Sequence, residues 1–267
     1  MEPNISEYTY GYVITDELIH NRHAGIIFAP TFLSSHREGL RGGGYDVRLD
    51  RVSGIPLFLQ FKLSHYLRRH SAREIKNGTF DSPYYRMYLR TSRHSNQHMM
   101  LLDLESQGTV FYTAPAFHRP DELNDAYLNH EVVKKSIWLS PSSIGRFSDN
   151  KIHYVAFQLL GKTRICSKEP EILNKQVGFD QFIKNISSKI KESGQSALKA
   201  QNLEKLADFM SEISKKKREI DLEKKRETDK ILRYREPIER IAFYSHVYFD
   251  CQLYIASLEP INVQPPE

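Results

Sequence analysis

The alternation of apolar and polar residues over residues 55–64 predicts a β-strand with polar side chains near its end. This stretch reads Ile-Pro-Leu-Phe-Leu-Gln-Phe-Lys-Leu-Ser. Because successive side chains of a strand point to opposite faces, Phe58, Gln60 and Lys62 share one face, and the intervening apolar residues share the other. Burial of an ammonium without a partner is costly. We therefore expect an anionic group beside Lys62, and Asp46, at the start of the preceding predicted strand, is the first candidate.

Other apolar stretches predict strands and helices around this one. β-Branched and aromatic residues predict strands over 84–90 and 109–115. A helix is predicted to begin at Ser95, with Gln97 and His98 in its first turn as secondary candidates for the site. Strands mixed with helices in this order predict an α/β fold with a mixed central sheet.

From about residue 174 the composition becomes helical. A three-to-four-residue spacing, typical of a packed helix seam, is kept by Leu203, Leu206, Met210, Ile213 and Ile220. The next seam positions are charged, so we expect one long helix with a solvated second half, ended by Pro237 and followed by a short strand over 252–257. The sequence therefore predicts an α/β core over 1–172 and a mostly helical region over 173–267, with a long charged helix and a return to the core.

Composition and cysteine usage point to an ordinary globular protein. The chain is 40% hydrophobic and 27% charged, and no apolar run approaches the roughly 18–20 residues that span a membrane. The first residues lack the basic region and apolar core of a signal peptide. Cys166 and Cys251 are far apart in apolar surroundings, which indicates two buried thiols in a reduced cytoplasmic compartment.

The positive charge of the chain is concentrated in one segment. The formal net charge is +5, and residues 215–235 alone hold ten Lys/Arg against five Asp/Glu. This segment could bind a polyanion, and its positive charges are closest together from Lys215 to Arg218. The alternative interpretation is a helix that is solvated or binds a protein partner.

A three-residue pattern carries the candidate chemistry. Asp46, thirteen intervening residues, and then Gln60-x-Lys62 resembles the PD-(D/E)xK nuclease superfamily, in the variant where Gln replaces the first acidic residue of the second motif. The resemblance covers roughly residues 38–63 and implies a restriction-endonuclease-like core. It implies that Asp46 and Gln60 bind Mg²⁺ or Mn²⁺ and that Lys62 lies beside the attacked phosphate.

The glutamine in this pattern makes a second carboxylate more necessary for metal binding. It offers one neutral oxygen where an acidic residue would offer a charge, so metal affinity should be lower. Glu38, eight residues before Asp46 and next to a glycine-rich loop, is the preferred additional metal ligand. Glu17, on a short first helix that Thr15 could cap, is the competitor.

The resemblance implies a metal-dependent endonuclease that cleaves DNA, in the setting of bacterial antiviral defence. The alternative is a catalytically degenerate nuclease-fold scaffold that assembles with a partner protein, such as an ATPase or a coiled-coil subunit. The chain has no G-x-x-x-x-G-K-[ST] sequence, so any ATP-driven step would belong to another chain.

Overall fold

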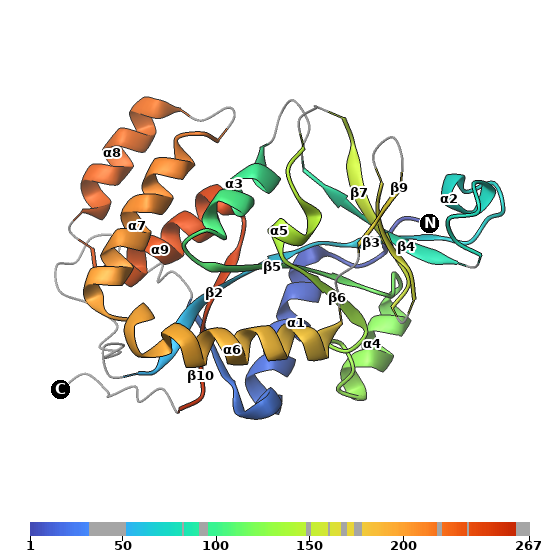
Figure 1. The fold of residues 1–267 in the computed structure, drawn as a ribbon, viewed down its shortest axis with the longest axis horizontal. Coiled ribbons are helices and arrows are strands. Elements are labelled where there is room, and N and C mark those ends of the chain that lie inside the picture. The colour runs from blue at the N-terminus through green and yellow to red at the C-terminus, as the bar shows by residue number, and fades with distance from the viewer. Residues whose placement is uncertain are drawn as a thin grey trace.

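The computed structural model describes residues 1–31, 52–81, 83–90, 96–147, 151–159, 161–166, 170–173, 178–217, 221–233 and 235–259. These residues form two five-stranded sheets flanked by helices (Figure 1). The helices are α1 (Glu7–Asn21), α2 (Arg73–Lys76), α3 (Gln97–Leu104), α4 (Pro120–Leu128), α5 (Pro141–Ile144), α6 (Phe179–Ala197), α7 (Ala200–Ser214), α8 (Leu222–Leu232) and α9 (Pro237–Tyr244), with a 3₁₀ turn η1 (His23–Gly25) and a π-helical turn η4 (Ser245–Phe249). The strands are β1 (Ile27–Thr31), β2 (Gly54–Phe61), β3 (Ser64–Leu67), β4 (Tyr84–Leu89), β5 (Thr109–Pro115), β6 (Ser136–Leu139), β7 (His153–Phe157), β8 (Thr163–Cys166), β9 (Pro170–Ile172) and β10 (Gln252–Ser257).

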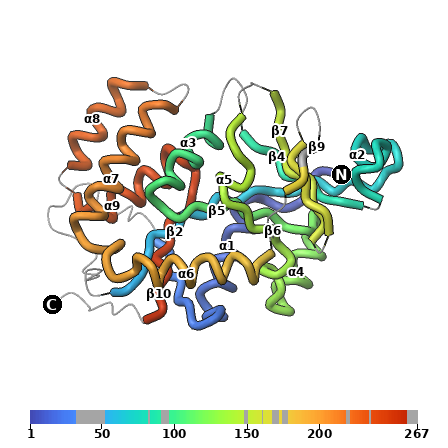
Figure 2. Tube along the Cα trace, viewed as in Figure 1, coloured from blue at the N-terminus to red at the C-terminus, as the bar shows by residue number. Residues whose placement is uncertain are grey.

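The first sheet is mixed and joins both ends of the chain. Its strand order is β1-β10-β2-β5-β6, with β2 parallel to β5 and antiparallel to β10. Figure 2 shows β10, near the C-terminal end of the colour scale, beside the blue β1 and β2. The predicted α/β fold with a mixed sheet is confirmed, and so are the short strand over 252–257 and the helical C-terminal region.

Helices cover both faces of the first sheet. Leu57 and Leu59 of β2 belong to a core cluster with residues of α1 and α6, whereas Phe58 belongs to the cluster formed with α3, α7 and α9. Because both faces are covered, seven of the eight residues of β2 are buried. The same geometry explains why the polar residues at the end of β2 lie beneath helices.

The second sheet is antiparallel, in the order β3-β4-β7-β8-β9. A buried carboxylate on α2 anchors this helix to the sheet. Glu74 accepts hydrogen bonds from the hydroxyls of Tyr84 and Tyr154 and forms a 2.6 Å ion pair with Arg86. These partners hold the pKa of the Glu74 carboxyl below its usual range, although burial acts to raise it.

The helices correct two sequence-based expectations. The first helix begins eight residues before Thr15, because Ser6 caps it by accepting a hydrogen bond from the Thr9 amide. The single long charged helix is instead two helices, α7 and α8. The Asp221 side chain caps α8 by accepting hydrogen bonds from the amides of Glu223 and Lys224. Lys225 Nζ then lies 3.4 Å from Ser211 Oγ of α7. A new cap and a docked side chain favour a helix that folds back over one that continues.

The two cysteines are buried free thiols, as expected. None of the helices in the described residues combines the length and the apolar character that a membrane crossing requires.

Candidate functional site

The end of β2 carries two polar side chains into the protein interior. Gln60 is 2% exposed and Lys62 is 4% exposed, and both lie on the face of β2 that Phe58 occupies. The Lys62 amide donates to the Thr113 carbonyl at 2.9 Å, so the backbone pairing with β5 continues past the last residue of β2. The predicted alternation of side chains along this strand is confirmed.

Gln97, in the first turn of α3, connects these two side chains. The Lys62 ammonium donates to Gln97 Oε1 at 3.1 Å, and Gln97 Nε2 donates to Gln60 Oε1 at 2.8 Å. The same Nε2 lies 3.2 Å from the Phe249 carbonyl and 3.2 Å from Asp250 Oδ2. The secondary candidate Gln97 therefore lies at the centre of the polar cluster, which we define as Gln60, Lys62, Gln97 and Asp250.

Asp250 is the acidic member of this cluster, and sequence reasoning missed it. It follows η4 in the left-handed conformation (φ 57°, ψ 40°) and stands two residues before β10, the antiparallel neighbour of β2. Its carboxylate also pairs with Arg90 at 3.0 Å, and both side chains are about half exposed. Asp250 thus links the buried cluster to the surface.

Lys62 is a buried cation with a neutral partner. Gln97 is the one hydrogen-bond acceptor of its ammonium among the described residues. Burial lowers the pKa of Lys62, as does the positive charge of Arg90, whereas the charges of Glu7 and Asp250 act to raise it. An ammonium has three N–H donors, and one of them is used by an acceptor among the described residues.

A basic turn adjoins the cluster. The Asn96 side chain, directly before α3, donates to the Lys216 carbonyl at 2.6 Å. Burial lowers the pKa of Lys217, while the charge of Asp250 acts to raise it and that of Arg90 to lower it. The segment after α7 therefore lies close to the half-exposed edge of the cluster.

Of the predicted acidic ligands, the structure describes Glu17 alone. Asp46 and Glu38 lie outside the described residues. Glu17 is engaged elsewhere, because its Oε2 accepts from the amides of Val132 and Val133 at 2.8 and 3.4 Å. Burial raises the pKa of the Glu17 carboxyl. Glu17 therefore holds α1 to the segment before β6 and is not the alternative carboxylate beside Gln60 and Lys62.

Two oxygen atoms of the cluster converge on one point. Gln60 Oε1 and Asp250 Oδ2 both lie within hydrogen-bond distance of Gln97 Nε2, so a partial positive charge fills the space between them. Oxygen donors of this kind suit Mg²⁺, which binds few protein ligands and keeps several waters. Among the described residues, no group of three or more His, Cys, Asp or Glu side chains could hold a metal ion.

Comparisons with protein-family models, with curated proteins and with solved structures find no match to this chain.

Proposed function

We propose that this protein is a metal-dependent nuclease that hydrolyses phosphodiester bonds of DNA, and that Lys62 contacts the phosphate at which the bond breaks. The buried ammonium of Lys62 is the observation that carries the proposal. Its one described hydrogen-bond partner is a neutral amide, and the half-exposed pair of Arg90 and Asp250 lies at the edge of the same cluster. A preorganised cation in a buried site stabilises the charge that develops on phosphorus-bound oxygens.

The oxygen donors of the cluster fit the divalent cation that this reaction requires. Gln60 and Asp250 would bind it once the Gln97 amide group turns aside, and Asp46 and Glu38 remain the predicted further ligands. When bound, the metal supplies an activated water and stabilises the attacked phosphate. Without the metal, Gln97 Oε1 holds the Lys62 ammonium in place, and Arg90 would offer a guanidinium to a neighbouring phosphate.

A scaffold without catalytic activity is the second candidate function. One observation favours it: the Gln97 amide group fills the point between Gln60 Oε1 and Asp250 Oδ2, and oxygens that already accept hydrogen bonds from an amide need no metal. Such a chain would assemble with a partner protein and retain the cluster for its packing.

Metal titration separates the two functions. Calorimetry with Mn²⁺ should show binding by the wild-type protein and weaker binding by Asp250→Asn and Asp46→Ala. Gln60→Glu should bind at least as tightly, because the substitution restores a charged ligand at the same reach. Asp81→Asn is a matched control, since Asp81 is an exposed carboxylate paired with Lys162.

Equal Mn²⁺ affinity in the wild-type protein, Asp250→Asn and Asp46→Ala would contradict the metal assignment. Weaker binding by Gln60→Glu would show that Gln60 has another role, such as a hydrogen bond to substrate.

A further inference from the structure

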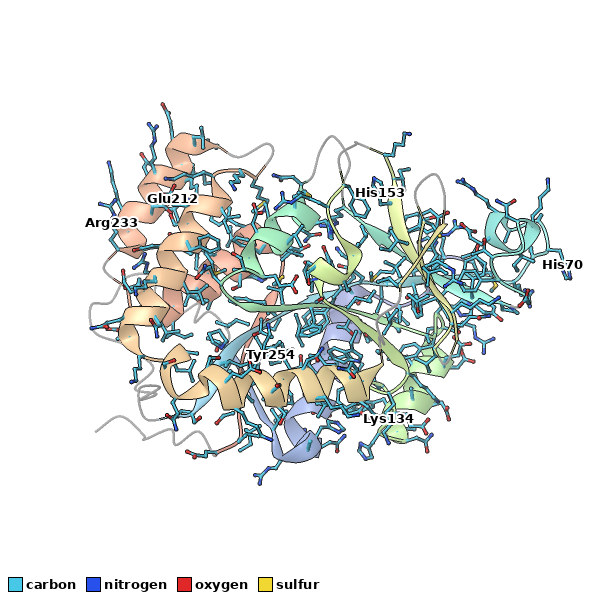
Figure 3. All side chains as sticks on the ribbon, in the orientation of Figure 1. His70, Lys134, His153, Glu212, Arg233 and Tyr254 are labelled. Carbon is cyan, nitrogen blue, oxygen red and sulfur yellow. The ribbon has the colours of Figure 1, made fainter. Side chains whose placement is uncertain are left out.

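The outer face of α8 carries a stripe of three cations, with the exposed carboxylates of Glu223 and Glu227 beside it. Helix α8 buries only Lys225 and Leu232. Arg226, Lys230 and Arg233 are exposed and stand at positions i, i+4 and i+7, which places them on one side of the helix. Figure 3 shows Arg233 at the outer edge of the molecule. In the described part of the chain, no ion pair involves the side chains of these three residues.

By contrast, the first lysines of the predicted polyanion-binding segment, Lys215 to Lys217, already contact other residues of the protein. Lys215 pairs with Glu212, and Lys216 pairs with Asp103 at 3.1 Å. Lys217 donates to the Val247 carbonyl at 2.7 Å. Among the described residues from 215 to 233, the cations whose side chains form neither an ion pair nor a hydrogen bond are Lys224, Arg226, Lys230 and Arg233.

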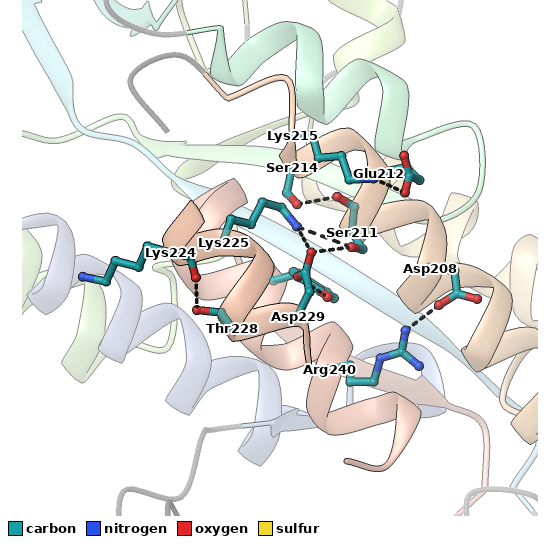
Figure 4. Close-up of polar contacts among 11 residues, drawn as sticks. Asp208, Ser211, Glu212, Ser214, Lys215, Lys224, Lys225, Thr228, Asp229 and Arg240 are labelled. Atoms are coloured by element: carbon teal, nitrogen blue, oxygen red, sulfur yellow. Dashed lines mark hydrogen bonds and ion pairs between the residues drawn. The ribbon is translucent and has the colours of Figure 1, made fainter. Parts of the chain in front are cut away.

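Helix α8 is held by its inner face, which leaves the outer face free to bind. The Lys225 ammonium lies 2.6 Å from Asp229 Oδ2 and 5.4 Å from the ring centres of Tyr244 and Tyr248. Figure 4 shows this cluster between α7 and α8, with Lys224 pointing away from it. One positive charge is thus neutralised inside, while the outer charges stay in solvent.

The same contacts place α8 next to the candidate site. Lys217 lies 5.6 Å from the ring centre of Tyr248, which Lys225 also approaches. Tyr248 belongs to η4 and precedes Asp250 by two residues. A polyanion bound at Asp250 and Lys62 would therefore lie close to α8.

We infer that the stripe of Arg226, Lys230 and Arg233 binds the phosphate backbone of double-stranded DNA. The choice of partner rests on the proposed function. Single strands are bound through aromatic stacking as well as charge, and α8 contains no aromatic residue. A membrane surface would need an apolar stripe. The exposed apolar residues Leu222 and Ile231 are nine positions apart, on opposite sides of the helix.

Binding measured without cleavage tests this inference. A short fluorescent DNA duplex is titrated in EDTA over a range of salt concentrations, with a single strand of the same length and anionic vesicles as alternative ligands. Replacement of Arg226, Lys230 and Arg233 by Gln should make the plot of log association constant against log salt concentration less steep by up to about 3, and should weaken binding at least about tenfold. The matched control replaces Lys184, Lys191 and Lys199 by Gln. Lys184 and Lys191 are exposed on α6, and the exposed Lys199 is the N-cap residue of α7. Helix α6 runs along the opposite side of the view in Figure 1.

The control variant should bind like the wild-type protein. An unchanged slope in the α8 variant, an equal loss in the control, or tighter binding of single strands or vesicles than of duplex would overturn the inference. The proposed function fails separately: a protein that binds duplex through α8 but never cleaves it supports the stripe and contradicts the nuclease.

Discussion

Two buried lysines in this protein have opposite environments. Lys225 is 2% exposed, and its ammonium faces the carboxylate of Asp229 at 2.6 Å and two tyrosine rings. Lys62 is 4% exposed and faces a neutral amide oxygen at 3.1 Å. Burial without an anionic partner disfavours the charged form, and the pKa of Lys62 is accordingly lowered.

Under the proposed function, the difference separates a cation that stabilises the fold from one that would contact the phosphate of a ligand. The ion pair with Asp229 offsets part of the cost of burying the Lys225 ammonium. Lys62 has no such compensation among the described residues, so its cost must be offset by packing elsewhere. Sites that bind or react are where proteins tolerate such costs.

The largest effect on stability is expected at Lys225. Lys225→Met should lower the free energy of unfolding of α8 by about 2 kcal/mol, because it leaves the Asp229 carboxylate without its cation in a mostly buried place. Amide hydrogen exchange over α8 and urea unfolding both measure this loss.

Lys225→Met combined with Asp229→Asn is the control. Removal of both charges should recover most of the lost stability, since the remaining side chain can still hydrogen-bond to Tyr244 and Ser211. Failure of the double variant to recover would show that the cation matters through the tyrosine rings instead.

Lys62→Met should change the free energy of unfolding in the opposite direction to Lys225→Met, and by a smaller amount. At neutral pH the variant should be more stable than the wild-type protein by about 1 kcal/mol, because an uncompensated buried charge is removed. The pKa of Lys62 is lower in the folded protein than the ordinary 10.5. Between these two values the unfolded chain binds more protons, so wild-type stability should rise with pH and the advantage of the variant should shrink.

Urea unfolding across the neutral-to-alkaline range measures this dependence. A variant less stable than the wild-type protein at neutral pH would mean that Lys62 stabilises the fold, as Lys225 does.

The smallest expected effect is a pair of opposite pKa changes. Arg90→Gln should raise the pKa of Lys62, because the positive charge of Arg90 lowers it, and Asp250→Asn should lower this pKa further. An NMR titration of the Lys62 side chain measures both changes. Shifts in the same direction would show that these variants act by moving the cluster rather than by removing a charge.

The sequence was informative where the signal was local. The alternation along β2 needs only neighbouring residues, so the shared face of Gln60 and Lys62 could be predicted. Gln97 could be recognised as a candidate because it lies in the first turn of a helix after the motif strand. Asp250 could not, because it reaches Gln97 across 153 residues through the pairing of β10 with β2.

The division between α7 and α8 was also out of reach of the apolar pattern. Heptad-like spacing reports which residues are buried, but not that Asp221 begins a new helix or that Lys225 folds back against Ser211. The helical composition of the region could be predicted because it depends on local propensity alone.

Cleavage of plasmid DNA by the wild-type protein, Lys62→Met and Lys225→Met, with Mg²⁺ or Mn²⁺ and with EDTA, tests the central claim most directly. The account predicts metal-dependent cleavage by the wild-type protein and by Lys225→Met at a temperature where it is folded. In Lys62→Met the rate should fall on the order of 100- to 1000-fold with DNA affinity nearly unchanged, as for loss of a comparable electrostatic donor. Cleavage by Lys62→Met at the wild-type rate, or none by the wild-type protein with either metal, would contradict it.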